Sequence, residues 1–489
     1  MPTVAIAGAS GFVGTALRAS LSADHNVVGL TRSPARAARN DPEDPTEWRH
    51  CDLFSLLEIE RALDGVDLAV YLVHSMLPSS RLTQGTFADL DLILADNFAR
   101  GAATAGVRQI VYLSGLLPDD TDDLSHHLRS RYEVEKTLAA HGVPVTTLRT
   151  GLVVGPGGSS LRILVNLVRR LPAMVLPKWT ESDTQPIALR DVIRTIRLVL
   201  GHPEAYDGTF DVAGPDVMNY REMMERTADV MNLERPMYGV PFITPRLSTL
   251  WVSLVSGSSQ ALAGPLVASL RHDMVATSNP LQKAIEPDAL GFEAALQASL
   301  DDDGALLPDP RQSHRRTDDA TIREARLVRS VQRFELPSGR TAEWAGREYM
   351  RWLNNFVGPI IRVRVTEADG RFEARFHVRP LPRPVLELAY APDRSDPDRA
   401  LFYVTGGLLA RTEDGGRGRL EFRSVLNREW LVAAIHDFSP RLPWGLYRLT
   451  QAVAHLFVMH RFGRHLARLD GHVEQPLAPR AASEAPGVS

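Results

Sequence analysis

The sequence has one cysteine, three lysines and a formal net charge of only −4. Cys51 has no second cysteine to pair with, which excludes an internal disulfide and a thiolate metal cluster contributed by one chain. The near-neutral charge gives no argument for nucleic-acid binding. No apolar run approaches the ~20 residues of a membrane span, and the opening "MPTVAIAGAS" is typical of a strand rather than a leader peptide. We therefore expect a cytoplasmic protein.

What is present is an ordinary globular composition, with 44% apolar and 23% charged residues in 489. A length of ~150 residues per domain predicts two to four units. Residues 299–325 are rich in charge and proline without apolar periodicity, and they form the predicted linker. The expected units are 1–235 with a helical extension at 236–298, and 326–470, followed by a disordered tail at 471–489.

Short apolar runs alternate with helical patterns through the first 155 residues. This alternation is typical of a parallel sheet with crossover helices, and it predicts an α/β, doubly wound, Rossmann-like fold. The segments between the runs space their apolar residues by three and four and end near glycine, as helices do. The predicted strands are 3–7, 27–31, 48–53, 68–74, 109–114 and 144–154.

The pattern loosens after Gly155, and residues 156–235 are predicted to form a substrate-side lobe of the same unit. In the helical extension, one apolar helix face is made by Leu247, Leu250, Trp251, Leu254 and Val255. We expect this face to pack against the lobe, with contact to a membrane surface as the alternative.

Residues 326–470 have a different pattern. Two stretches alternate like antiparallel strands joined by Asp-Gly and Gly-Gly turns, and a long amphipathic helix closes the unit. The expected fold is α+β with an antiparallel sheet. The histidines His455, His460 and His465 of this helix step by about 140° around its axis, so they cannot converge on one metal ion.

The first predicted strand runs into "GASGFVG", which places Gly8, Gly11 and Gly14 at a strand-to-helix turn. Glycines there let the backbone approach a pyrophosphate, whose charge is held by free amides at the start of the helix. A three-glycine match alone is weak, but this one follows the first strand and opens a helix. The turn predicts a dinucleotide cofactor, bound also by its Ser10, Phe12 and Val13.

The end of the second strand indicates which dinucleotide binds. An acid is usual there for NAD, but the sequence "TRSPARAAR" offers Arg32. Because a guanidinium matches the geometry of a phosphate, Arg32 favours NADP(H), with NAD(H) as the alternative. Asp52 closes the third strand and is placed to accept a hydrogen bond from the adenine amine, next to Leu53.

Tyr132 and Lys136 stand four residues apart in "LRSRYEVEK". On a helix they share a face, and the ammonium group would favour the phenolate, making Tyr132 a usable proton donor or acceptor. Ten tyrosines and three lysines in 489 residues give about 0.06 such spacings by chance. The pair also lies between the fifth and sixth strands, so its helix borders the carboxyl ends of the sheet, where ligands bind.

These motifs, with "CDL", "VYLSG", "LRTGLVVGPG" and "FDVAGPD", resemble the extended and atypical short-chain dehydrogenase/reductases, a group that includes epimerase-like and NmrA-like proteins. The resemblance covers residues 3–235. It implies that Tyr132 is the acid/base, that Lys136 lowers its pKa and binds the nicotinamide ribose, and that Ser114 lies beside the nicotinamide. It also implies cofactor contacts for Val73, Gly151 and Val153.

The sequence departs from that family in two places. Extended members have a Ser or Thr about two positions beyond Ser114 to polarise the substrate carbonyl, and this chain has Leu116. In the fourth strand, His74 and Met76 replace small residues, which disfavours a sugar-nucleotide substrate.

The C-terminal unit, through "GGLLAR", "GRLEFR" and "IHDFSPRLPWGLYRLTQAVAH", resembles a domain of uncharacterised function that follows such reductase-like domains. It is also similar to START-like, helix-grip lipid-binding folds, which implies an apolar ligand or lipid.

The leading hypothesis is an NADP(H)-binding oxidoreductase that acts on an apolar carbonyl or quinone-like compound. The alternative is a catalytically silent NADP(H)-binding sensor or assembly scaffold whose C-terminal domain holds a lipid or partner, which Leu116 favours. A sugar-nucleotide epimerase or dehydratase ranks third. The oligomeric state is not predicted.

Overall fold

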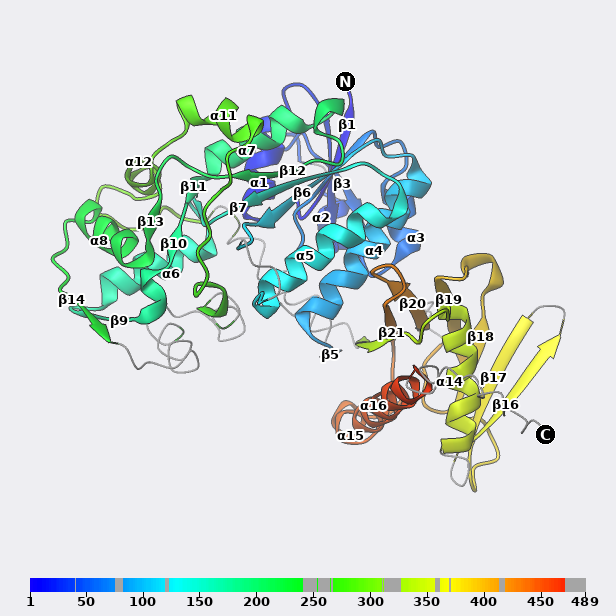
Figure 1. Ribbon diagram of the computed structural model, residues 1–489. Helices are drawn as coiled ribbons and strands as arrows, with labels where there is room; N and C mark the ends of the chain where they lie inside the picture. The colour runs from blue at the N-terminus through cyan, green and yellow to red at the C-terminus, as the bar shows by residue number, and fades with distance from the viewer. Residues whose placement is uncertain are drawn as a thin grey trace, which may run out of the picture. The chain divides into compact units, whose positions relative to one another are not determined.

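The structure is a computed structural model that describes residues 1–39, 41–74, 82–118, 123–240, 253, 264, 267–309, 311, 327–356, 361–368, 371–412 and 418–470. The chain divides into two compact units. Unit 1 comprises Met1–Arg81 and Thr86–Ala325, and unit 2 comprises Leu82–Gly85 and Arg326–Ser489 (Figure 1). The predicted apolar face at 247–255 lies outside the described residues except for Ser253, and so do the predicted tail and most of the predicted linker beyond residue 311.

Unit 1 is built on a seven-stranded sheet in the order β12-β7-β6-β4-β1-β2-β3, and every neighbouring pair is parallel. This confirms the Rossmann-like parallel sheet. Its strands are β1 Thr3–Ala7, β2 Asn26–Thr31, β3 Glu47–His50, β4 Leu68–Tyr71, β6 Ile110–Gly115, β7 Val145–Thr150 and β12 Thr209–Val212.

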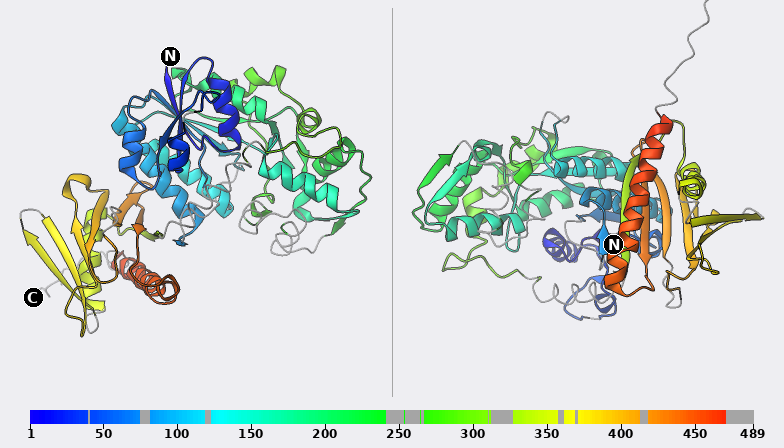
Figure 2. Two further views of the ribbon diagram at one scale, coloured as in Figure 1. Left: turned by 180° about the vertical axis from the view of Figure 1, so that it is seen from behind. Right: turned by 90° about the horizontal axis from the view of Figure 1, so that it is seen from below.

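Helices cover both faces of this sheet, because its central strands are apolar on both sides. α1, α7 and α11 share one apolar core with β1 and β4, and α3, α4 and α5 pack together on the other face (Figure 2). The bounds are α1 Phe12–Leu21, α2 Pro34–Ala37, α3 Leu56–Ala62, α4 Phe87–Ala105, α5 His126–Leu138, α7 Leu189–Val199 and α11 Pro280–Ile285.

A lobe beyond the carboxyl ends of the strands has a second apolar core, made mainly by α6, α8 and α12. Short strand pairs connect its segments. The bounds are β8 Val153–Val154, α6 Ser159–Arg170, β9 Met174–Pro177, β10 Asp183–Thr184, β11 Ile187–Ala188, β13 Met218–Asn219, α8 Tyr220–Val230, β14 Met237–Val240 and α12 Phe292–Gln297.

Unit 2 is an eight-stranded sheet in the order β16-β17-β18-β19-β20-β21-β15-β5. All pairs are antiparallel except that of β5 with β15, so the predicted antiparallel sheet is present. The bounds are β5 Leu82–Gln84, β15 Val328–Glu335, β16 Ile361–Ala368, β17 Arg371–Val378, β18 Leu386–Tyr390, β19 Arg399–Gly406, β20 Arg419–Val425 and β21 Trp430–Phe438.

Three helices of unit 2, α14 Ala342–Phe356, α15 Trp444–Leu449 and α16 Gln451–Asp470, contribute side chains to one apolar core with the sheet. Phe462 of α16 is fully buried there, and its ring contacts the rings of Tyr349, Trp352 and Phe422. The alternation of the strands aims Leu420 and Phe422 at this core.

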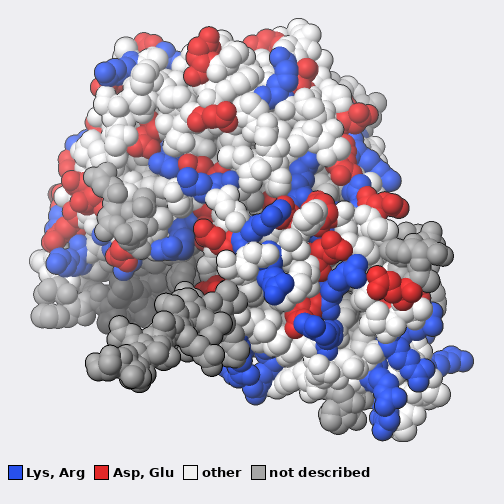
Figure 3. Space-filling model, turned by 45° about the vertical axis from the view of Figure 1, so that its right-hand side comes forward, with Lys and Arg blue, Asp and Glu red and all other residues white. Residues whose placement is uncertain are grey.

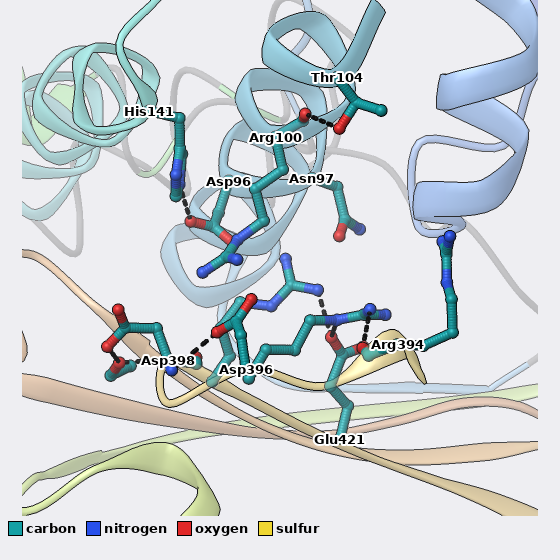
Figure 4. Close-up of polar contacts among 12 residues, drawn as sticks. Asp96, Asn97, Arg100, Thr104, His141, Arg394, Asp396, Asp398 and Glu421 are labelled. Carbon is teal, nitrogen blue, oxygen red and sulfur yellow. Dashed lines mark hydrogen bonds and ion pairs between the residues drawn. The ribbon is translucent and has the colours of Figure 1, made fainter. Parts of the chain in front are cut away.

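The alternate side chains of β20 therefore point to the opposite face of the sheet. They are Arg419, Glu421 and Arg423. There Glu421 accepts hydrogen bonds from Arg399 and Arg423 (Figure 4), and Arg419 donates to Asp437. These contacts form a charge set that links β19, β20 and β21.

Charges of both signs are interspersed over the face of the molecule drawn in Figure 3. This mixture agrees with the small net charge. Among the described helices, none is long and apolar enough to cross a bilayer.

Candidate functional site

The glycine turn lies where β1 passes into α1, and its geometry requires glycine. Gly8 has φ +91°, and the Gly11 amide donates to the Gly8 carbonyl oxygen at 2.8 Å. A Cβ atom on Gly14 would lie 2.2 Å from that same oxygen. The turn therefore fits the pyrophosphate of a dinucleotide, which would approach the backbone of Gly8–Gly14 and the first amides of α1. Ser10, Phe12 and Val13 lie in this turn and are half-buried.

Substituting Gly14 by alanine is expected to weaken NAD(P)H binding at least about tenfold, because the new methyl group displaces the Gly8 carbonyl that shapes the turn. Fluorescence titration with NADPH measures this. Gly445→Ala is the matched control, since its Cβ would meet no atom within 4 Å. Equal affinity of the Gly14→Ala protein would contradict the assignment of the turn.

The predicted adenosine-side residues follow β2 and β3. Arg32 is exposed directly after β2, and Ser33 caps the short helix α2. The carboxylate of Asp52 accepts from the Phe54 amide at 3.2 Å, and the Leu53 carbonyl accepts from Asn97 Nδ2 at 2.9 Å. Their placement at the carboxyl edge of the sheet is compatible with a cofactor role.

A cavity of about 370 Å³ extends from the turn residue Phe12 along the carboxyl ends of β6 and β7 into the lobe. The predicted site residues Ser114, Gly151 and Val153 line it. Val73 does not, and it is half-buried just beyond β4. Its lining is mainly apolar, and the larger apolar side chains are Leu113, Leu116, Leu128, Leu152, Ile163, Leu164, Leu167, Trp179, Met223, Met224, Val267, Leu270 and Met274. A cavity of this kind suits an apolar ligand.

His74, just beyond β4, and the buried Asp91 of α4 form a hydrogen-bonded pair at the cavity. His74 Nδ1 lies 2.7 Å from Asp91 Oδ2, and the carboxylate side chain is 2% exposed. Because a carboxylate only accepts, the ring proton lies on Nδ1, which leaves Nε2 as an acceptor in the neutral ring. His74 Nε2 is buried without a hydrogen-bond partner among the described residues.

His127 and Arg131, four residues apart on α5, also line the cavity. The rings of His127 and His74 are 5.2 Å apart. Burial, with the nearby Arg131 and His74, lowers the pKa of His127 to about 2. Burial alone would lower the pKa of Arg131, but Tyr112 and Asp91 outweigh it and raise that pKa. Arg131 therefore stays a cation beside neutral imidazoles.

The same cation affects His74. Burial and then Arg131 lower the pKa of His74, although the hydrogen bond to Asp91 acts in the opposite direction. At neutral pH the ring of His74 is thus predominantly uncharged.

The structure brings Tyr132 and Lys136 together, with Lys136 Nζ 5.1 Å from the centre of the Tyr132 ring. Neither residue is among those that line the described cavity, and Lys136 is exposed. The α5 positions that do line it are His127, Leu128 and Arg131. The four-residue spacing predicted that Tyr132 and Lys136 share a face of α5. The residues of α5 that line the cavity, however, belong to the preceding helical turn.

Sequence reasoning missed Asp91, His127 and Arg131, and it noted His74 only for its bulk. One signal was available for Asp91, because an acid inside the apolar stretch "LDLILADNF" must be buried with a partner. His127 and Arg131 show the same four-residue spacing as Tyr132 and Lys136. Without the fold, nothing marked them as the pair that lines the cavity.

Comparison with known proteins agrees with the glycine turn. Residues 8–165 match a family described as NAD(P)H-binding. Unit 1 therefore contains an NAD(P)H-binding domain.

Two curated relatives match part of this chain. Auxiliary protein GraX of Staphylococcus aureus is 31% identical over 188 residues, which is 37% of this chain and 55% of GraX, so the chain spans about half the length of that relative. An epimerase family protein of Mycobacterium bovis is 26% identical over 255 residues, 48% of this chain and 80% of its own length.

Solved structures resemble part of this chain. A nucleoside-diphosphate-sugar epimerase from Staphylococcus aureus gives a TM-score of 0.49 at 17% identity and covers 61% of this chain and 100% of its own. The triphenylmethane reductase of Citrobacter sp., complexed with NADP(H), gives 0.48 at 16% identity and covers 60% of this chain and 99% of its own.

Proposed function

We propose that the protein is an NADP(H)-dependent oxidoreductase that interconverts an apolar carbonyl or quinone-like compound and its reduced form. The observation that carries this proposal is the His74–Asp91 pair in the wall of an apolar cavity that begins at the glycine turn. An acid/base group, an apolar substrate space and a dinucleotide turn are the three parts that such a reaction needs.

The chain's own residues would hold the cofactor at both ends. The turn Gly8–Gly14 would bind the pyrophosphate, Arg32 the 2′-phosphate, and Ser114, Gly151 and Val153 would border the nicotinamide. When bound, the nicotinamide supplies a hydride to the substrate carbon or takes one from it.

His74 would move the proton. In the oxidative direction, Nε2 takes the proton of the substrate hydroxyl, and Asp91 stabilises the resulting imidazolium through Nδ1. In the reductive direction, the imidazolium returns that proton to the carbonyl oxygen. Arg131 is placed to stabilise negative charge that develops on this oxygen, a task for which Leu116 has no polar group.

Tyr132 with Lys136 is the other proposed acid/base pair. It has the predicted spacing and mutual contact, whereas His74 lines the cavity. Substituting each residue separately distinguishes the two assignments.

A silent NADP(H)-binding sensor or scaffold is the second proposed function. Leu116 favours it, because this residue is 1% exposed in the cavity wall where a hydroxyl would polarise a carbonyl. The deciding experiment titrates the protein with NADPH and NADH, then follows the loss of absorbance at the NADPH band with a panel of quinones and aldehydes. Tight NADPH binding without turnover of any compound would refute the oxidoreductase and support the sensor.

Replacing Arg32 by aspartate is expected to weaken NADPH binding about 10- to 100-fold, since a charge-assisted phosphate contact contributes about 1.5–3 kcal/mol. NADH binding should change much less. Both affinities are measured by fluorescence titration, with Arg169→Asp, an exposed position on α6, as the control. An equal loss for both cofactors would refute the assignment of Arg32 to the 2′-phosphate.

A further inference from the structure

The outer face of α15 and α16 in unit 2 carries an unusual group of exposed apolar side chains. Leu446 is 49% exposed, Leu449 80%, Val453 57% and Phe457 52%. Leu446 and Leu449 stand three residues apart on α15, and Val453 and Phe457 stand four apart on α16, so each helix turns its pair to one side. The two pairs are called the apolar stripe. Figure 2 shows the two helices as the orange-to-red segment along one side of the unit 2 sheet.

The stripe continues along α16 as positive charge. Val453, Phe457, His460, Arg461, Arg464 and Arg468 fall within an arc of about 100° on the helix, at 3.6 residues per turn. All six are exposed. The guanidinium of Arg461 lies 5.2 Å from the centre of the Phe457 ring, where the apolar part meets the basic part. We call Leu446, Leu449, Val453, Phe457, Arg461, Arg464 and Arg468 the outer stripe.

The opposite face of α16 is buried in the core of unit 2, which keeps the outer stripe at the surface. Ala452, Met459, Phe462 and Leu466 are 2% exposed or less and belong to the core of unit 2. Rotating α16 to bury the outer stripe would expose Phe462 and its aromatic contacts. Packing therefore fixes the apolar stripe at the surface.

The charge of this segment has one sign. From Trp444 to Leu469 the sequence contains four arginines, Arg448 among them, and no aspartate or glutamate. Asp470, the last residue of α16, accepts a hydrogen bond from the Ser338 amide. A helix arc that carries an apolar stripe and arginines is complementary to an anionic lipid headgroup layer, which accepts apolar side chains and attracts arginines together.

We propose that the outer stripe docks unit 2 on a lipid surface that contains anionic headgroups. Leu446, Leu449, Val453 and Phe457 enter the headgroup and acyl boundary, and Arg461, Arg464 and Arg468 contact phosphates at the same level. The charge term alone would attract any polyanion, but a nucleic acid offers nothing for a leucine that is 80% exposed.

The test is co-sedimentation of the full chain with vesicles. Vesicles of phosphatidylcholine alone are compared with vesicles that contain about 30% phosphatidylglycerol, at low and high salt. We expect binding to the anionic vesicles, which weakens as salt rises. The Arg461→Gln/Arg464→Gln protein should bind about 25-fold more weakly, at about fivefold per arginine. Leu449→Ser/Phe457→Ser should weaken binding at least about tenfold.

Matched controls separate this surface from general effects. Arg362→Gln/Arg364→Gln removes two exposed arginines of β16, and Leu198→Ser removes an exposed apolar residue of α7. Both controls should bind vesicles like the original protein, and circular dichroism should show every variant folded. Failure of the original protein to bind anionic vesicles, or unchanged binding by the stripe variants, would overturn the proposal. A third outcome would also overturn it. If the original protein is a dimer that binds no vesicle, and a stripe variant is a monomer, then the outer stripe contacts a second copy of the chain.

Discussion

Replacement of His74 by glutamine is expected to lower turnover of the carbonyl or quinone substrate about 10²- to 10⁴-fold, the usual contribution of general acid–base catalysis. Glutamine keeps much of the volume and a polar end, but it cannot accept and return a proton at the position of Nε2. Steady-state kinetics measure turnover, and NADPH titration should show an affinity within about twofold of the original.

Two comparisons make this result specific. Asp91→Asn should lower turnover as well, because it removes the carboxylate that orients the ring and stabilises the imidazolium. Tyr132→Phe is the matched variant at the other proposed acid/base. If it abolishes turnover while His74→Gln does not, then Tyr132 is the acid/base and the assignment to His74 is wrong.

The pH profile gives an independent measurement. Burial and Arg131 lower the pKa of His74, so its protonated fraction at neutral pH is small. Reduction needs the imidazolium and should quicken as pH falls toward that pKa, whereas oxidation needs the neutral ring and should slow. A reductive rate that rises with pH would contradict this role.

Truncating Phe462 to alanine is expected to destabilise unit 2 by about 3–5 kcal/mol, the usual cost of removing a fully buried aromatic side chain. The residue is 0% exposed, and its ring contacts those of Phe334, Tyr349, Trp352, Phe422 and His465. Urea unfolding followed by circular dichroism measures the change in the free energy of unfolding.

Phe457→Ala is the matched control for this measurement. The same substitution five residues earlier on α16 removes a side chain that is 52% exposed, so it should cost less than about 1 kcal/mol. Equal losses of stability would mean that the inner and outer faces of α16 are assigned wrongly.

Much of unit 1 could be predicted from the sequence, because short apolar runs between helical patterns are a local signal. Strand 3–7 was predicted at its observed bounds, and the runs at 27–31 and 109–114 correspond to β2 and β6. The run at 144–154 instead forms β7 and β8. Gly151 interrupts it, where a Cβ would lie 2.4 Å from the Gln185 carbonyl oxygen. That close approach involves a distant segment, and no local pattern reveals it.

The candidate site was predictable only in part for the same reason. The glycine turn is contiguous, so its residues and its spacing could be identified together. His74, Asp91 and Arg131 come from three separate segments, and what unites them is a hydrogen bond and shared burial in three dimensions. A spacing of four marks residues that share a helix face, but it does not say which turn of the helix lines the cavity.

The pairing of strand β5 with β15 affects when the sheet of unit 2 can form during synthesis of the chain. Leu82–Gln84 lies within the N-terminal half of the sequence, yet it pairs in parallel with Val328–Ser330 in the sheet of unit 2. Ser330 Oγ donates to Gln84 Oε1 across a separation of 246 residues. During synthesis this edge of the sheet cannot close until the ribosome has produced the second half of the chain. A polypeptide started at residue 326 would lack Leu82–Gln84 and leave the edge of β15 open to other strands, so the sheet of unit 2 needs a segment from the first part of the chain.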